Sequence, residues 1–94
     1  MFDIKIQDGK DIVLTGRFDA SQIDKAYNIL NTLKSDCIVD FKGLEYISSA
    51  GLGALIKTYA RLKESGNSIR LVNMNNHIKE VFRISALDKV FIIE

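Results

Sequence analysis

The chain contains no proline and no tryptophan, and it has one cysteine and one histidine among its 94 residues. A lone cysteine excludes an intramolecular disulfide and a metal site built from several cysteines. The single histidine, His77, has no second imidazole with which to form a metal site. We therefore expect no bound metal and no cofactor. Without proline, the turns must be made by Gly, Asn and Asp.

Long apolar runs and a charge excess are also missing. No stretch approaches the roughly 20 apolar residues that span a bilayer, and the first residues lack the basic start and apolar segment of a signal peptide. The formal net charge of +1 offers no general attraction to nucleic acid. We therefore expect a cytoplasmic protein that binds neither membrane nor nucleic acid, with a monomer as the default state.

The residues that are present suit one small globular domain. Hydrophobic residues make up 47% of the chain and charged residues 27%, which is the balance of a soluble folded protein. A chain of 94 residues can bury one modest core, so we expect a single domain over residues 1–94. Cys37 lies in the apolar segment CIVDF, which predicts a buried thiol.

Two periodicities divide the chain into strands and helices. Alternating or continuous apolar residues predict strands, and apolar residues three or four apart predict helices. The predicted strands cover residues 2–7, 12–16, 37–41 and 68–74, and residues 91–94 form a last strand or an ordered tail. The predicted helices cover residues 23–33, 52–62 and 75–90.

Turn and capping residues mark the boundaries between these elements. Asp8 and Gly9 predict a tight hairpin between the first two strands. Asp19 and Ser21 are both suitable N-caps for the first helix. Gly43 is expected to interrupt the strand of residues 37–41. Gly66 is expected to follow the second helix in the left-handed conformation.

The predicted order is strand, strand, helix, strand, helix, strand, helix, strand. A hairpin followed by alternating helices and strands is typical of an α/β protein with a mixed sheet. We therefore predict a small α/β sandwich, with an N-terminal β-hairpin, a mixed sheet of four to five strands and three to four helices.

Two adjacent serines, Ser48 and Ser49, stand where a strand passes into the second helix. The first turn of a helix has free N–H groups and a partial positive charge, so it favours an anion such as phosphate. Gly51 and Gly53 weaken that turn, and glycines without Cβ atoms let another protein approach the backbone closely. The alternative is that one serine only caps the helix and that the glycines serve internal packing.

Enzyme motifs do not match the same segment. The residues around Ser49 are YISSAGL, which is not the G-x-S-x-G of a nucleophilic serine, and no S-x-x-K follows. The lysine of a phosphate-binding loop is also missing after the last glycine. A hydrolase that used Ser49 would need His77 as its base. A nucleotide-binding domain would need converging polar groups, and the sequence offers no obvious set. We therefore expect no enzymatic activity.

Residues 40–53, DFKGLEYISSAGLG, resemble the signature of the STAS domain, in particular that of the bacterial anti-sigma-factor antagonists. The similarity extends to LTGRFDASQ before the first helix and to most of residues 64–93. It therefore covers nearly the whole chain. The resemblance implies the STAS fold, a small α/β sandwich.

The resemblance also implies a phosphorylation switch. The unmodified protein is expected to bind an anti-sigma factor that is also a serine kinase, which frees the sigma factor. The kinase then phosphorylates Ser49, with Ser48 the less favoured acceptor, and a PP2C-type phosphatase resets the protein. The residues expected to contact the partner are Asp19, Ser48, Ser49, Ala50, Gly51, Leu52 and Gly53. The alternative is a non-switching STAS scaffold subunit of a signalling or lipid-transport complex.

Two positions depart from the family pattern. Ser48 stands where the family commonly has Asp, which leaves both serines as candidates for modification. Arg17 stands where the family usually has Glu, on a loop expected to lie near Asp19 and Ser49, and we expect it to alter the choice of kinase. The basic residues of the second helix either contribute to that choice or form a solvated face. They are Lys57, Arg61 and Lys63.

Overall fold

The structure is a computed structural model that describes residues 1–8 and 10–94, and the described residues form five strands and three α-helices. The strands are β1 (Asp3–Gln7), β2 (Asp11–Phe18), β3 (Cys37–Ile47), β4 (Ile69–Val72) and β5 (Ile92–Ile93). The helices are α1 (Ile23–Leu30), α2 (Ser49–Glu64) and α3 (Asn76–Ile84), with short 3-10 helices η1 (Ala20–Gln22) and η2 (Leu87–Lys89). The order of the elements is the predicted one.

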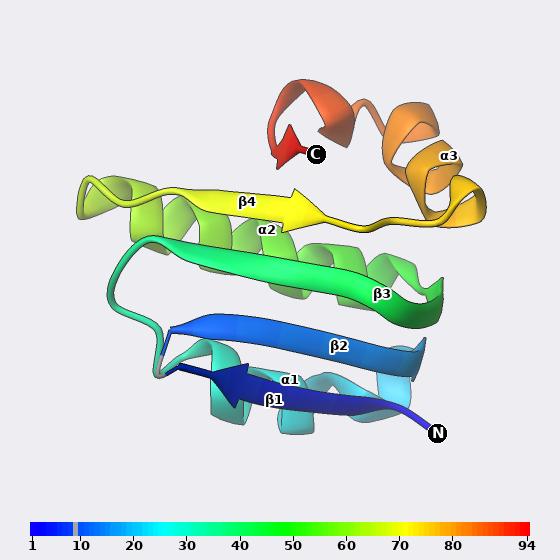
Figure 1. The fold of residues 1–94 in the computed structure, drawn as a ribbon, viewed down its shortest axis with the longest axis horizontal. Helices are drawn as coiled ribbons and strands as arrows, with labels where there is room; N and C mark the ends of the chain where they lie inside the picture. The colour runs from blue at the N-terminus through cyan, green and yellow to red at the C-terminus, as the bar shows by residue number, and fades with distance from the viewer. Residues whose placement is uncertain (9) are drawn as a thin grey trace.

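The five strands form one mixed sheet in the order β1-β2-β3-β4-β5 (Figure 1). β1 pairs antiparallel with β2, and all the other neighbours are parallel. This confirms the predicted α/β class, the mixed sheet and the N-terminal hairpin. Gly9, which the sequence places in the hairpin turn, lies outside the described residues.

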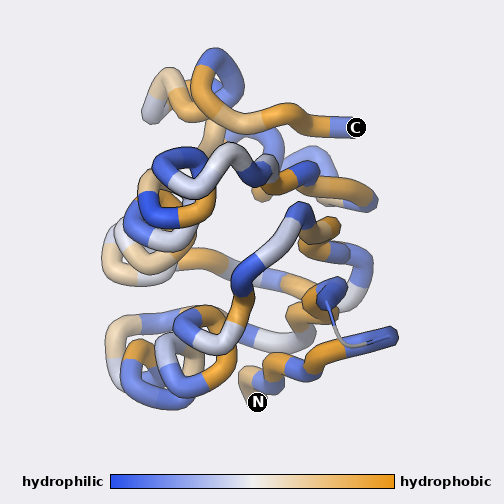
Figure 2. Tube along the Cα trace, turned by 90° about the vertical axis from the view of Figure 1, so that its left-hand side faces the viewer, coloured by the Kyte–Doolittle hydropathy of each residue, from blue (hydrophilic) through white to orange (hydrophobic). Residues whose placement is uncertain are grey.

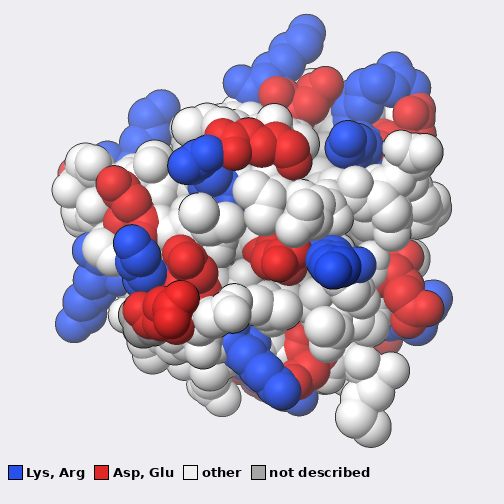
Figure 3. Space-filling model, in the orientation of Figure 1, with Lys and Arg blue, Asp and Glu red and all other residues white. Residues whose placement is uncertain are grey.

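The molecule has two layers. α1 and α2 lie side by side against one face of the sheet, behind it in Figure 1 and to its left in Figure 2. The opposite face, turned toward the viewer in Figure 1, carries Lys and Arg interspersed with Asp and Glu (Figure 3). The alternating burial along β2 follows from this arrangement, because only every second side chain points toward the helices.

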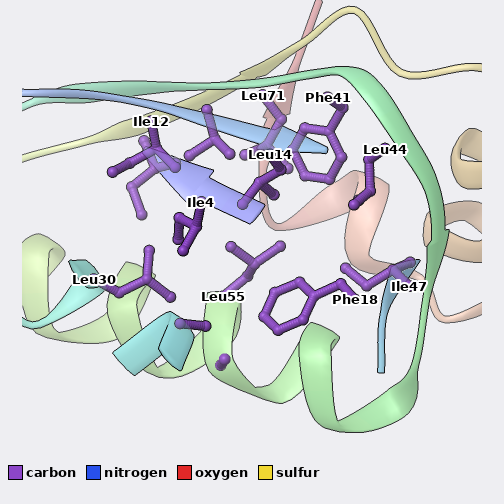
Figure 4. Close-up of a cluster of buried hydrophobic side chains, with 14 of the residues drawn as sticks. Ile4, Ile12, Leu14, Phe18, Leu30, Phe41, Leu44, Ile47, Leu55 and Leu71 are labelled. Carbon is purple, nitrogen blue, oxygen red and sulfur yellow. The ribbon is translucent and has the colours of Figure 1, made fainter. Parts of the chain in front are cut away.

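The hydrophobic core fills the space between the sheet and the helices (Figure 4). Its largest fully buried aromatic side chains are Phe18, Phe41 and Phe82. The predicted burial of Cys37 is confirmed, since its side chain is 3% exposed. Burial, followed by the charges of Asp11 and Asp36, raises the pKa of the Cys37 thiol to about 11.

β3 is longer than the sequence predicts. We expected Gly43 to interrupt the strand, but the strand continues through it to Ile47. The register with β2 shifts at this point, so that Asp40 pairs with Val13 and Gly43 pairs with Thr15. A Cβ at Gly43 would lie 2.7 Å from the Thr15 Cγ2 atom, so the glycine permits this close packing at a β-bulge.

The ends of α1 and α2 differ in how well they were predicted. Asp19 caps η1, the short turn that leads into α1. Gly66 follows α2 with φ +80°, as predicted. However, α1 ends at Leu30 and not at Leu33, although Leu33 is still buried. After Leu30 the backbone hydrogen bonds join residues three apart, such as the Leu33 N–H and the Leu30 carbonyl, as in a 3-10 turn.

Candidate functional site

The two serines have different positions at the start of α2. β3 ends at Ile47, Ser48 is the extended N-cap residue, and Ser49 is the first helical residue. The Ser48 hydroxyl accepts a hydrogen bond from the Gly51 N–H at 3.1 Å. The Ser48 N–H donates to the Phe18 carbonyl at 2.9 Å. The hydroxyl and the N–H of Ser48 therefore hold the junction together.

Ser49 is exposed, in contrast to the half-buried Ser48. Its position as the first helical residue places its side chain beside the free N–H groups of the helix terminus. The first turn of α2 contains no Asp or Glu, so no negative side chain of that turn neutralises the positive end of the helix dipole. An anion attached to Ser49 would be stabilised there without displacing the cap.

The glycines after Ser49 face in different directions. Gly51 is buried, and a Cβ added to it would lie 2.9 Å from the Ile47 Cγ1 atom and 3.1 Å from the Phe18 ring. Figure 4 shows Phe18 and Ile47 over the end of α2 that joins β3. A Cβ added to Gly53 would meet no atom within 4 Å. Gly51 therefore serves internal packing, whereas Gly53 has open space beside it.

The residues on either side of Gly51 also differ in burial. Leu52 belongs to the core, with 9% of its side chain exposed, and Ala50 is half-buried. Of the residues that the resemblance places at a partner contact, Ser49, Ala50 and Gly53 thus have exposed surface on α2, and Gly51 and Leu52 lie beneath them. The contact surface remains a prediction.

Replacing each of the two glycines with Ala is expected to change the stability in opposite directions. Gly53→Ala is expected to raise the free energy of unfolding by about 1 kcal/mol, because Ala favours helix and meets no neighbour. Gly51→Ala is expected to lower it by about 1 kcal/mol, because the contacts with Ile47 and Phe18 outweigh the helical gain. Urea denaturation of both variants measures the difference. Equal effects would contradict the inward packing of Gly51.

Asp19 is connected to the serine pair by the β2–β3 ladder. It follows Phe18, whose carbonyl binds the Ser48 N–H. Its carboxylate accepts hydrogen bonds from the Ser21 N–H at 3.0 Å and from the Ser21 hydroxyl at 2.5 Å. Asp19 is half-buried and shapes the turn next to the site.

Arg17 and Tyr46 form a second feature beside the serines. The expectation that Arg17 lies on a loop is wrong, because it belongs to β2 and pairs with Tyr46 of β3. Its guanidinium carbon lies 4.4 Å from the centroid of the Tyr46 ring. Tyr46 is not among the contact residues expected from the sequence. The sequence could not reveal this pairing, because two register shifts between β2 and β3, at Val13/Thr15 and at Gly16/Arg17, decide which residue of β3 lies opposite Arg17.

The basic residues of α2 do not form one solvated or partner-facing group. Arg61 is half-buried, and its guanidinium donates to the carbonyls of Leu33 at 2.7 Å and Leu30 at 2.9 Å. It therefore binds carbonyls at and beyond the end of α1, where the backbone hydrogen bonds from Thr32 to Ile29 and from Leu33 to Leu30 tighten the last turn. Lys57 and Lys63 are exposed.

Arg61→Ala is expected to lower the free energy of unfolding by about 2 kcal/mol, since hydrogen bonds to charged groups are worth about 1.5–3 kcal/mol. Arg61→Lys should recover part of the loss, because an ammonium can bind one carbonyl but cannot bridge both. Lys57→Ala is the matched control on the same helix and should change stability by less than about 0.5 kcal/mol. A neutral Arg61→Ala, measured by urea denaturation, would contradict this role.

Other candidate sites are weaker. A hollow of about 350 Å³ between α1 and α2 is lined by Tyr27, Asn31, Lys57, Thr58 and Arg61. His77 is exposed at the start of α3. In the described residues, no three His, Cys, Asp or Glu side chains gather as metal ligands. None of the helices described here has the length and apolar character needed to cross a membrane.

Comparison with known proteins identifies the family. The family model described as "Mlab, STAS domain" matches residues 5–94. The chain therefore belongs to the STAS domain family.

Two curated relatives have related names. BtrV of Bordetella bronchiseptica, whose name places it among the anti-sigma factor antagonists, is 31% identical over 72 residues, which cover 77% of this chain and 56% of BtrV. The anti-sigma-B factor antagonist of Bacillus subtilis is 29% identical over 56 residues, which cover 60% of this chain and 51% of that protein. The chain thus spans about half the length of the curated relatives it matches.

Solved structures show the same fold. A Thermotoga maritima protein, whose name places it in the same class, matches with a TM-score of 0.78 at 21% identity, over 98% of this chain and 84% of that one. SpoIIAA from Bacillus in its phosphorylated form matches with a TM-score of 0.71 at 18% identity, over 100% of this chain and 91% of that one. The predicted STAS-like sandwich is therefore confirmed.

Proposed function

We propose that this protein is an anti-sigma-factor antagonist that is switched by phosphorylation of Ser49. In its unmodified form it binds an anti-sigma factor that has serine kinase activity, and the sigma factor is released in the cytoplasm. Membership of the STAS family and the names of two relatives support the antagonist role. In this scheme the protein is the substrate and the ligand of the kinase, and not itself a catalyst.

The different roles of the two serines carry the proposal. Ser48 uses its hydroxyl to cap α2, and Ser49 is exposed beside it. A kinase acting on Ser49 therefore leaves the cap in place. A kinase acting on Ser48 would first have to break the hydrogen bond to Gly51.

A phosphate on Ser49 would affect the fold and the partner in opposite ways. It adds a charge of about −1.5 to −2 at neutral pH. The free N–H groups of α2 stabilise this charge within the protein. At a closely packed contact the same charge must lose its hydration and repels acidic groups of the partner. We therefore expect the fold to persist while the contact is lost.

Phosphate transfer tests this proposal directly. Each serine-kinase anti-sigma factor encoded in the source genome is purified and incubated with the protein and ATP, and the intact mass is recorded. We expect one added phosphate in the wild type and none in Ser49→Ala. Ser48→Asn is the matched control, because Asn also caps helices well, and it should still be modified. A PP2C-type phosphatase should remove the phosphate.

Two results would contradict the switch. One is phosphorylation of Ser49→Ala at the wild-type rate, which would place the modified residue elsewhere. The other is stable binding without any phosphate transfer by any of the kinases. That result would favour a constitutive STAS scaffold subunit of a signalling or lipid-transport complex.

A further inference from the structure

Arg17 is an exposed cation held in a defined position. It pairs with Tyr46 across the β2–β3 ladder, and its guanidinium carbon lies 4.4 Å from the centroid of the Tyr46 ring. A guanidinium stacked on an aromatic ring retains its N–H donors around the edge of the plane. Stacking also restricts the long side chain, so less rotational entropy is lost when a ligand binds.

The ladder connects Arg17 to the serine pair. The next pair in the register is Phe18 with Ile47, and the Phe18 carbonyl accepts the N–H of Ser48 at 2.9 Å. Ser49 follows immediately as the first residue of α2. The stacked cation and the exposed hydroxyl are thus fixed at the same end of the sheet by consecutive backbone contacts.

The charges around Arg17 leave it available to a partner. None of the ion pairs in the described residues includes Arg17. The carboxylate of Asp19 is already bound by Ser21. Glu45 is exposed at the shift in register before Tyr46, and no described contact joins it to Arg17. The first turn of α2 adds only the positive end of a helix dipole.

We propose that Arg17, held on the Tyr46 ring at the end of the sheet where α2 begins, binds a carboxylate on the anti-sigma factor. This inference rests on the proposed function and adds the chemistry of the partner surface. A guanidinium can bind a carboxylate through two parallel hydrogen bonds, which gives both attraction and orientation.

Charge reversal tests the inference. The probe is the purified anti-sigma factor that binds the wild type but not the Ser49→Asp variant. Its affinity is measured by titration calorimetry at two salt concentrations. Arg17→Glu is expected to weaken binding about tenfold or more at low salt. The difference should shrink at high salt, because exposed charges are screened. Arg17→Lys should be intermediate, because Lys keeps the charge but loses the planar donors.

Lys63 provides a matched control. It is also exposed over a tyrosine, with its ammonium 5.6 Å from the centroid of the Tyr59 ring. It lies at the other end of α2, about 20 Å from Ser49 at a rise of about 1.5 Å per residue. Lys63→Glu makes the same change of charge and should leave the affinity within about twofold of the wild type.

The outcomes separate this inference from the proposed function. If Arg17→Glu binds like the wild type while Ser49→Asp does not, the role of Arg17 is wrong and the switch stands. If Arg17→Glu and Lys63→Glu weaken binding equally, the attraction is general and Arg17 has no special role. If no anti-sigma factor discriminates the wild type from Ser49→Asp, both proposals fail. Circular dichroism of each variant confirms that the fold is retained.

Discussion

Ser49→Asp is expected to bind the anti-sigma factor about a hundredfold more weakly than the wild type while being slightly more stable. The loss of affinity follows from placing a like charge opposite an acidic partner surface, which costs several kcal/mol, and each 1.4 kcal/mol is a factor of ten. The gain in stability follows from the position of Asp in the first turn of α2. A carboxylate there is worth about 0.3–1 kcal/mol.

The opposite signs of these effects make the prediction specific. A substitution that merely damaged the site would lower both affinity and stability. Ser49→Asn is the matched control, since it has nearly the size of Asp without the charge, and it should bind within about threefold of the wild type. Affinity by calorimetry and the thermal midpoint of unfolding measure the two effects. A Ser49→Asp variant that binds as tightly as Ser49→Asn would show that charge does not operate the switch.

The elements of the fold could be predicted because local patterns determine most of them. The alternation of Phe2 and Ile4 and the helical spacing within residues 52–62 locate a strand and a helix without knowledge of the rest of the chain. The strand-to-helix junction at Ser48 and Ser49 was predicted for the same reason. At this junction, candidate capping residues lie within a few positions of the point where the apolar pattern changes from that of a strand to that of a helix.

The errors arose where distant residues decide the local structure. The turn after α1 is held by Arg61, about thirty positions further along the chain, which binds the carbonyls of Leu30 and Leu33. Gly43 lies within β3 opposite Thr15 of the neighbouring strand, which fills the space that a side chain would need. Gly51 faces inward because Phe18 lies beneath it. None of these contacts leaves a periodic signal in the sequence.

The family resemblance favours Ser49 as the phosphate acceptor, but residue spacing alone could not predict which of the two serines caps the helix. Ser and Asn residues are good N-caps at either of two adjacent positions, and the sequence does not fix where the helix begins. The structure distinguishes the two, because the Phe18 carbonyl binds the N–H of Ser48 and so holds that residue in the extended conformation. The helix must then start at Ser49.

Phe18 therefore links the core to the candidate site, and Phe18→Ala is expected to lower the free energy of unfolding by about 3–5 kcal/mol. Its side chain is fully buried and stacks on Phe2, with ring centroids 4.5 Å apart. The backbone of Gly51 packs on the same ring. The loss is a large part of the roughly 5–15 kcal/mol by which a small domain is stable. Phe18→Leu, which retains most of the volume, should cost less than about 2 kcal/mol.

The local effect of Phe18→Ala distinguishes it from other core mutations. Phe82 is equally buried but packs against Phe41 and Phe91, away from α2's first turn. Phe82→Ala should cause a similar loss of overall stability. Only Phe18→Ala or Phe18→Leu should selectively speed hydrogen exchange at the amides of Gly51 and Leu52, which Ser48 binds in the wild type. Exchange at these amides that rises equally in the Phe82 variant would show that the first turn of α2 does not depend on Phe18, and Ser49 would then owe its position to the helix cap alone.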